Sequence, residues 1–193
     1  MPGGDFDPAW SPDGKSIVVT SLQDGRQHIY IMDSNGDNRR LLSISGGVDY
    51  QPRWAPDGKR IVFISSVGDR SIVFLENADP SNLLRTEFST VTYTTASPDW
   101  SVGDYILYVL GSHGQVVVYK EDSRFNQIPL SPAYQGTTVA RFSPDGQWVL
   151  FDMTIKQNRD IYLLPLVGAA EPRRITTERS IETDPAWRPI PAG

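Results

Sequence analysis

The stretch DPAWSPDGKSIVVTS, residues 7–21, decides the fold because versions of it return along the chain. The related stretches are QPRWAPDGKRIVFIS from Gln51, ASPDW from Ala96, VARFSPDGQWVLFD from Val139 and DPAWRP from Asp184. Anchored on the aromatic residue before the turn, the copies are placed at Trp10, Trp54, Ala96 (in an aromatic's place), Phe142 and Trp187, with periods of 44, 42, 46 and 45 residues. A repeat of this length predicts an array of equivalent structural units.

Each repeat contains one turn and four short apolar segments. Ser-Pro-Asp-Gly suits a β-turn because proline presets φ at the second position, aspartate suits the third and glycine relieves steric strain at the fourth. In the third copy we align Ser97-Pro98-Asp99 with Ser11-Pro12-Asp13. The first strand of each repeat then precedes the turn. The later strands are predicted at 16–21, 60–65, 105–110 and 148–153 (second), at 28–33, 71–76, 115–120 and 160–165 (third), and more weakly at 39–44, 82–87, 126–131 and 173–178 (fourth).

The composition agrees with strands throughout. The chain has 39% hydrophobic residues, with eight Tyr, seven Phe and five Trp punctuated by sixteen Gly and fifteen Pro. Four short antiparallel strands in a period of about 40 to 45 residues are typical of a propeller blade. The sequence therefore predicts an all-β, single-domain β-propeller over 1–193. Its four complete four-stranded blades are placed at 5–47, 48–90, 91–136 and 137–181, with an extra first strand at 182–190.

Charge and composition exclude several classes of function. The 18 basic and 23 acidic residues give a net charge of −5 without a basic run longer than an Arg pair, so nucleic acid is not an expected partner. The sequence has no stretch of 18 apolar residues and no signal peptide at its start, so membrane insertion is not expected. The absence of cysteine excludes disulfides and thiolate metal sites but leaves the compartment undetermined.

The first repeat, DPAWSPDGKSIVVTSLQDGRQHIYIMDSNGDNRRLL, resembles the PD40 (WD40-like) repeat of TolB-type propellers. The resemblance covers essentially the whole chain and implies a ring of six or more blades. Three readings follow: the C-terminal portion of a larger propeller, a chain that closes its ring by pairing with another copy, or a four-bladed monomer with one redundant strand. The resemblance also suggests a periplasmic or other extracytoplasmic location, and docking of a partner at the mouth of the central channel.

Polar residues recur just before each Pro-x-aromatic anchor. If the first strands line a channel, their carboxylates gather near one mouth, where they could bind a partner or hold Ca²⁺ through oxygen ligands. The alternative is that each carboxylate accepts local backbone hydrogen bonds in its own turn. The position is also occupied by Thr137 and Val139 in the fourth copy. The predicted partner-binding residues are Asp5, Asp7, Asp49, Gln51, Glu182 and Asp184; no cofactor is assigned.

Candidates for catalysis are few. His28 and His113 lie far apart without a motif partner, and the G-x-S-x-G spacing of a serine hydrolase does not occur. Residues that recur once per blade are interpreted as structural. They are the turn aspartates Asp13, Asp57, Asp99 and Asp145, and the inter-blade aromatics Trp10, Trp54, Phe142, Trp187, Tyr30, Phe74, Tyr119 and Tyr162.

These observations favour a non-catalytic protein-interaction module. An acidic channel rim would prefer a basic segment of a partner protein or peptide, because complementary charge accelerates association. Two alternatives stay open: an accessory gating propeller of a peptidase-like enzyme, and a propeller that binds carbohydrate or calcium.

Overall fold

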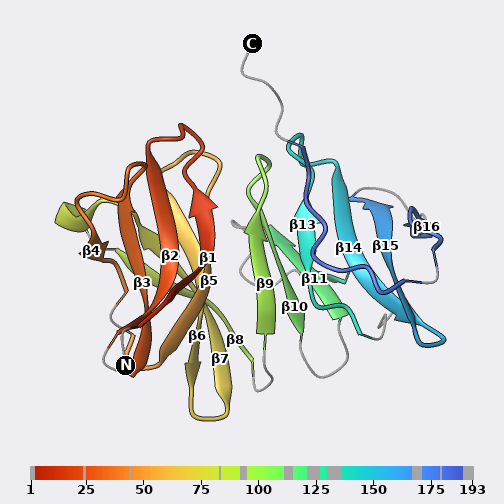
Figure 1. The fold of residues 1–193 in the computed structure, drawn as a ribbon, viewed down its shortest axis with the longest axis horizontal. Coiled ribbons are helices and arrows are strands. Elements are labelled where there is room, and N and C mark those ends of the chain that lie inside the picture. Colours follow the sequence, from red (N-terminus) through yellow and green to blue (C-terminus); the bar gives the residue numbers. More distant parts are fainter. Residues whose placement is uncertain are drawn as a thin grey trace. The chain divides into compact units, whose positions relative to one another are not determined.

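In the part of the chain that the structure describes, the strands form four antiparallel sheets, each made of four strands that are consecutive in the sequence (Figure 1). The computed structural model describes residues 3–23, 25–43, 45–82, 84–91, 95–110, 115–120, 127–129, 136–166, 171–178 and 180–188. The first sheet contains β1 (Asp5–Trp10), β2 (Ser16–Gln23), β3 (Arg26–Asp33) and β4 (Arg40–Leu41), and the second β5 (Val48–Trp54), β6 (Arg60–Val67), β7 (Arg70–Asn77) and β8 (Arg85–Val91). The third contains β9 (Thr95–Trp100), β10 (Tyr105–Leu110), β11 (Gln115–Lys120) and β12 (Gln127–Pro129), and the fourth β13 (Ala140–Phe142), β14 (Trp148–Ile155), β15 (Asn158–Pro165) and β16 (Arg173–Arg174). The prediction of an all-β fold with four-stranded blades is confirmed.

The chain divides into two compact units, residues 1–94 and 95–193, and each unit holds two sheets. A short 3-10 turn, η1 (Pro80–Asn82), precedes β8. No helix in the described ranges is long and apolar enough to cross a membrane.

Each unit has a hydrophobic core between its two sheets. Alternate residues of a strand face opposite sides, so each sheet turns one set of side chains towards its neighbour. In the first unit the core consists of Val18, Ile29, Ile31, Leu42, Ile61, Phe63, Ile72, Phe74 and Ala78. In the second it consists of Leu107, Val109, Ala140, Phe142, Val149, Phe151, Met153, Tyr162 and Leu164. Each large apolar side chain buried in this way contributes about 1.5–3 kcal/mol, so the pairing of sheets stabilises each unit.

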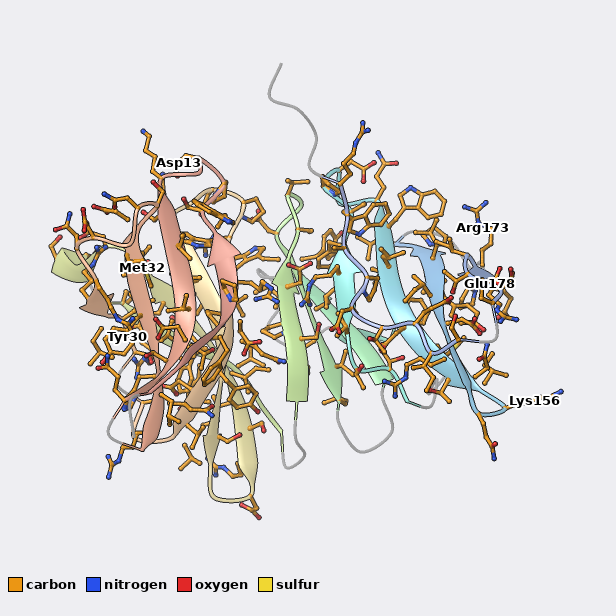
Figure 2. All side chains as sticks on the ribbon, viewed as in Figure 1. Asp13, Tyr30, Met32, Lys156, Arg173 and Glu178 are labelled. Carbon is orange, nitrogen blue, oxygen red and sulfur yellow. The ribbon has the colours of Figure 1, made fainter. Side chains whose placement is uncertain are left out.

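The predicted turn has the same backbone in three sheets. Gly14, Gly58 and Gly146 have φ of 69°, 68° and 69°, a left-handed conformation that glycine adopts without steric cost. Asp13, at the tip between β1 and β2 (Figure 2), accepts hydrogen bonds from Ser11 Oγ (2.7 Å) and the Lys15 backbone N–H (3.1 Å). These bonds, the one from Ser11 first, lower the pKa of Asp13. The turn aspartate therefore holds the turn together.

The third repeat differs from the prediction, and the alignment of Ser97-Pro98-Asp99 with the turn is wrong. These residues lie inside β9, and the turn is formed by Ser101–Asp104, where the Asp104 N–H donates to the Ser101 carbonyl (3.2 Å). Asp104 has the left-handed φ, 58°. The turn is one residue shorter, because Ser101 N bonds the carbonyl four residues on, at Tyr105, instead of five. The aromatic anchor of the third repeat is therefore Trp100, not Ala96.

The first strands share a kink before their proline. Asp7, Gln51, Ser97 and Asp184, each three residues before a tryptophan, have φ of 52°, 54°, 57° and 54°. In β1 the pairing with β2 shifts register between Phe6 and Ala9, which is a β-bulge. Because left-handed φ is uncommon outside glycine, its recurrence at one repeat position marks equivalent strands independently of side-chain identity.

Candidate functional site at the first strands

In each unit, a tryptophan indole N–H donates a hydrogen bond to a backbone carbonyl of the preceding repeat. Trp54 Nε1, in β5, donates to the Ala9 carbonyl of β1 (3.1 Å). Trp187 Nε1 donates to the Arg141 carbonyl of β13 (3.3 Å). Ala9 and Arg141 both directly precede the aromatic anchor of their own repeat. In both cases the indole N–H of one repeat's tryptophan donates to the carbonyl of the residue just before the anchor of the preceding repeat. We call this hydrogen bond the indole joint.

The indole joint explains why Trp10 is not part of the core. Trp10 was predicted to pack between blades, yet it is 58% exposed, whereas Phe142 is 6% exposed and Trp54 packs against the core of the first unit. The anchor aromatic contacts the preceding repeat, and no repeat precedes β1 in the described residues. The prediction is therefore wrong for Trp10, because an anchor is buried only when its neighbour is present. Tyr119 belongs to β11, but its side chain lies outside the described ones, as does His113.

The segment predicted as an extra first strand, 182–190, is not a strand in its described part, which ends at Arg188. It nevertheless lies along the fourth sheet, where the dark-blue chain passes β13 and β14 (Figure 1). The Glu182 N–H donates to the Arg159 carbonyl (3.0 Å), and Trp187 makes the indole joint to β13. Asp184 has the φ of a first-strand kink. The segment thus has the kinked backbone of a first strand and makes the indole joint of a first strand. Within the described residues, no second strand pairs with it.

Asp49, one of the predicted rim residues, is completely buried. Its carboxylate accepts hydrogen bonds from Ser43 Oγ (2.6 Å) and Ser45 Oγ, while Ser43 Oγ accepts the Ile29 backbone N–H (2.9 Å). Asp49 therefore ties the segment after β4 to the start of β5. A side chain with no exposed surface cannot contact a partner directly, so its role in binding would be to position the strand.

His28 has a neighbour that the sequence did not reveal. Its Nδ1 lies 3.6 Å from Asp49 Oδ2, which is beyond hydrogen-bond distance. Ser43 and Ser45 donate to the carboxylate and not to the imidazole. A serine nucleophile needs its hydroxyl to donate to the base, so this group of Ser, His and Asp side chains has the hydrogen bonding of a structural cluster.

Asp7 and Gln51 are connected through Thr20. The Thr20 hydroxyl donates to Asp7 Oδ2 (3.4 Å), and its oxygen accepts the Gln51 backbone N–H (3.1 Å). Since Asp7 and Thr20 belong to the first sheet and Gln51 to the second, the three residues form a polar link between two sheets. The kinked backbone presents the Gln51 N–H to the neighbouring sheet instead of to its own.

Asp5 forms a paired contact with Arg39. Arg39 Nη1 and Nη2 donate to its two carboxylate oxygens at 2.5 and 2.8 Å, and Nη2 also donates to Ser21 Oγ. The hydrogen bond from Arg39 lowers the pKa of Asp5. The Asp5 side chain is 39% exposed and keeps access to solvent.

Glu182 and Asp184 make short-range contacts. Ser180 Oγ donates to Glu182 Oε1 (3.0 Å), and Thr183 Oγ1 donates to Asp184 Oδ2 (3.2 Å). Asp184 is exposed. Within the part of the chain that the structure describes, no three His, Asp or Glu side chains are grouped to hold a metal ion.

The fourth repeat has an acidic residue that the predicted set of partner-binding residues does not include. Asp152, which is completely buried in β14, accepts the backbone N–H groups of Thr138 (2.7 Å) and Val139 (2.9 Å). It also accepts the Thr138 hydroxyl, and thereby holds the chain that enters β13. This carboxylate belongs to the second strand of its repeat and not to the first, so a search at a fixed offset from the anchor does not find it.

Ser97 and Asp99 make contacts between β9 and β13 that the misaligned turn concealed. The Phe142 N–H donates to Asp99 Oδ2 (2.8 Å), and the Ala140 N–H donates to Ser97 Oγ (3.0 Å). Both bonds connect β9 to β13. Alignment on Trp100 would have revealed them, because it places Ser97 at the kink position of Asp7.

Repeated four-stranded sheets that are joined through their first strands define the architecture of a β-propeller. The family model described as "TolB beta propeller domain" (PD40) matches residues 1–132, more than half of the sequence, and the chain belongs to this family. The structure of a putative TolB from Agrobacterium tumefaciens is similar with a TM-score of 0.77 and 19% identity, over 92% of this chain and 64% of that one.

Peptidases are also among the similar proteins. A structure from a study of two prolyl endopeptidases is similar with a TM-score of 0.63 and 12% identity, over 92% of this chain and 30% of that one. The "Uncharacterized peptidase YuxL" of Bacillus subtilis (strain 168) is 28% identical over 156 residues, which make up 80% of this chain and 22% of that protein. The chain therefore spans about a fifth of the length of this curated relative. The structural similarities, at these identities, show the fold alone.

Proposed function

We propose that the chain is a non-catalytic protein-interaction module of the TolB-like propeller type and forms the C-terminal portion of a larger propeller. The main support is the arrangement at the first strands. Hydrogen bonds between sheets fix the backbone there, through Asp49, Thr20 and the indole joint, while the carboxylates of Asp5 and Asp184 reach solvent. A rigid scaffold that presents ionised groups is suited to docking, because little conformational entropy is lost on binding.

The charge of the chain suggests a basic partner segment. The net charge is −5, and the Asp5 side chain is 39% exposed. Exposed carboxylates attract Lys and Arg side chains over about 8–10 Å at moderate ionic strength, which raises the association rate more than the affinity. We therefore propose a Lys/Arg-rich peptide segment as the ligand class.

The test is titration of a ¹⁵N-labelled sample with a Lys/Arg-rich peptide. We expect the largest chemical-shift changes at the exposed carboxylates, around Asp5 in the first unit and around Asp184 in the second, each considered by itself, and weaker binding both in added salt and after Asp184→Asn. The matched control is Asp37→Asn, an exposed aspartate in the loop that follows β3. That loop lies beside the turn at Lys15, at the other end of the strands, since the Ser34 N–H donates to the Lys15 carbonyl. Equal losses from both variants, or no binding, would refute the proposal.

A second candidate is a gating propeller of a peptidase. It is favoured by the similarity to YuxL and to the prolyl endopeptidase structure. The serine motif G-x-S-x-G is absent from these 193 residues, so the catalytic groups would belong to another domain. Turnover of a fluorogenic proline-containing peptide by the chain alone would contradict both candidates, because each places catalysis elsewhere.

We extend the proposal to an extracytoplasmic location, on the basis of the resemblance to TolB-type propellers. Fractionation of cells that express the natural gene would test this part separately. Recovery in the cytoplasmic fraction alone would contradict it without affecting the docking proposal.

A further inference from the structure

We propose that His28 is a pH-responsive link between the first and second sheets. A proton on its imidazole draws Nδ1 into a charge-assisted hydrogen bond with Asp49 and so strengthens the contact between the two sheets. The inference goes beyond the proposed function, because it concerns residues of one unit and needs no partner molecule. Peptide binding and the response to pH can therefore succeed or fail independently of each other.

The first observation is a buried nitrogen atom without a hydrogen bond. His28 Nδ1 is buried and has no hydrogen-bond partner among the described residues, while the imidazole as a whole is 20% exposed. Buried polar atoms without a partner are uncommon in folded proteins and lower the stability. A neutral imidazole carries its N–H on only one of its two nitrogens, whereas the protonated ring has an N–H on both. Protonation therefore ensures that Nδ1 is a donor.

The second observation is the acceptor that faces this nitrogen. Asp49 Oδ2 lies 3.6 Å from His28 Nδ1, and the Asp49 side chain has no exposed surface. The hydrogen bonds that it accepts come from the hydroxyls of Ser43 and Ser45. A buried carboxylate gains more from a charged donor than from a neutral one, because charge-assisted hydrogen bonds are stronger. A small movement of the imidazole towards Asp49 would complete such a bond.

The fourth sheet has the same backbone arrangement at the equivalent place. The Ile29 N–H of the first sheet donates to Ser43 Oγ (2.9 Å), and the Ile161 N–H of the fourth sheet donates to Thr176 Oγ1 (2.9 Å). The carbonyls of both isoleucines accept a backbone N–H from the segment that contains this hydroxyl. The residues directly before the two isoleucines therefore occupy equivalent positions.

In the fourth sheet that position belongs to an ion pair. Asp160, which is 1% exposed, accepts a hydrogen bond from Arg174 Nη2 (2.7 Å). Aspartate and arginine side chains ordinarily titrate outside the range from about pH 5.5 to about pH 8. The first sheet has His28 at this position, and histidine is the side chain that ordinarily titrates near pH 6.5. The first unit thus has a contact of the same kind with Asp49 whose charge depends on pH.

The charged groups around His28 include both signs. Ser21 of β2 lies directly opposite His28, and Arg39 Nη2 donates to Ser21 Oγ. Arg39 is itself paired with Asp5, which lies opposite Ser21 on the other side, so a positive and a negative group accompany each other there. On the strand of His28, Arg26 is two residues away and exposed. Asp49 is the acid at ion-pair distance from the imidazole within the described residues.

Glu76 of β7 is the titratable group that must be separated from His28. Burial raises the pKa of Glu76 against the lowering effect of Arg85, and the charge of Asp49 adds to the rise. Glu76 therefore also takes up a proton as the pH falls. A pH dependence of the unsubstituted chain assigns no residue by itself, so the experiment needs a variant of His28.

The experiment measures hydrogen exchange at two backbone amides as the pH is lowered from about 8 to about 5.5, across the ordinary titration range of histidine. The Ile29 N–H reports the chain of hydrogen bonds through Ser43 to Asp49, and the Ile161 N–H is the matched internal control. Protection factors correct for the intrinsic effect of pH on exchange. We expect the protection factor of Ile29 to rise about tenfold relative to that of Ile161, because a hydrogen bond to a charged group is added. No relative rise at Ile29 would refute the proposal.

Two variants identify the groups responsible. His28→Gln keeps a polar side chain that has no charge, and Asp49→Asn removes the anion, so the relative rise should disappear in both. His113→Gln, at the other histidine of the chain, should leave it unchanged. A rise that persists in His28→Gln would assign the effect to another group and overturn the proposal, whether or not Asp49→Asn folds. Titration of the same samples with the Lys/Arg-rich peptide reports the proposed function separately.

Discussion

The first and second sheets carry equivalent residues on one face, and in the first unit that face packs against a neighbouring sheet only in the second sheet. The equivalent pairs are Trp10 and Trp54, Ile17 and Ile61, Val19 and Phe63, Tyr30 and Phe74, Met32 and Glu76, and Arg39 and Arg85. Trp10 is exposed, and Tyr30 and Met32 (Figure 2) are half-buried, whereas Ile61 and Phe63 are completely buried. The repeat sequence thus specifies the position of a side chain, and the neighbouring sheet decides its burial.

The arginine of this face shows the consequence for charge. Arg85 lies over the rings of Phe63 and Phe74 and donates to the buried Glu76 (2.7 Å). Arg39 lies 4.6 Å from the Tyr30 ring centroid and donates to the exposed Asp5. Burial raises the pKa of Glu76 against the lowering effect of Arg85, while the hydrogen bond from Arg39 lowers the pKa of Asp5. The arginine at this repeat position thus pairs with Glu76 in one sheet and Asp5 in the other, and the pKa values of these two acids shift in opposite directions.

The largest expected difference between the two faces is at the tryptophans. Trp54→Ala removes an indole that packs against the core and bonds Ala9, so we expect a loss of about 3 kcal/mol in the free energy of unfolding. Trp10→Ala should change it by less than about 0.5 kcal/mol, because the side chain is mostly exposed. Urea unfolding followed by circular dichroism measures both. Equal losses would mean that Trp10 is covered in solution.

The next comparison is between a buried and an exposed carboxylate of the first strands. Asp49→Asn weakens the acceptor of two serine hydroxyls in a buried site and should cost about 2 kcal/mol. Asp184→Asn alters an exposed side chain and should cost less than about 0.5 kcal/mol. Thermal unfolding of the two variants in parallel provides the measurement. A larger effect at Asp184 would contradict the assignment of Asp49 to the joint between sheets.

The shortened turn of the third repeat offers a stabilising change. Asp104 has a left-handed φ of 58°, where the other three turns have glycine. Asp104→Gly should raise the free energy of unfolding by about 0.5–1 kcal/mol, since relief of the left-handed strain exceeds the added entropy of the unfolded chain. Gly58→Ala is the reverse change in an equivalent turn and should destabilise. Destabilisation by Asp104→Gly would show that the aspartate side chain has a role of its own.

The smallest effect is expected for the ion pair on the open face. Asp5 has a folded-state pKa below its ordinary value of 3.8, so its contribution is present above that pH and lost as pH falls through the lower pKa. At neutral pH, Asp5→Asn should therefore cost about 0.5 kcal/mol, the usual size for an exposed pair, and the difference from the unsubstituted chain should vanish in acid.

Glu76 is the buried acid that corresponds to Asp5 in this comparison. The effect of Glu76→Gln on the free energy of unfolding should change with pH in the opposite direction. The folded-state pKa of Glu76 lies above its ordinary value of 4.5, so the stability that its titration contributes is present below that value and lost as pH rises through the raised pKa. Free energies of unfolding measured across the acid range would show the two trends. Parallel trends would contradict the assigned environments.

The sequence predicted the class of fold because turn chemistry and strand pattern are local. The turns at Gly14, Gly58 and Gly146 and the strands after them could be placed from composition alone. The third repeat could not, because its Gly103-Asp104 reverses the usual order and its first strand, β9, contains a Ser-Pro-Asp sequence that resembles the turn.

The candidate site was predicted less completely, since burial depends on residues from other strands. Asp5 and Asp49 have the same offset from their anchors, yet only Asp49 meets Ser43 and Ser45, from the segment after β4. Nothing in either repeat alone distinguishes the two carboxylates. The assignment of the six first-strand residues to partner binding stays a prediction.

The indole joint is tested most directly by hydrogen exchange at the tryptophan side chains. In a ¹⁵N-labelled sample with indole signals assigned by Trp→Phe substitution, the Nε1–H groups of Trp54 and Trp187 should exchange slowly, because both donate to backbone carbonyls of strands. That of Trp10 should exchange rapidly. Rapid exchange at Trp187, equal to that at Trp10, would contradict the view that residues 182–187 dock as a first strand.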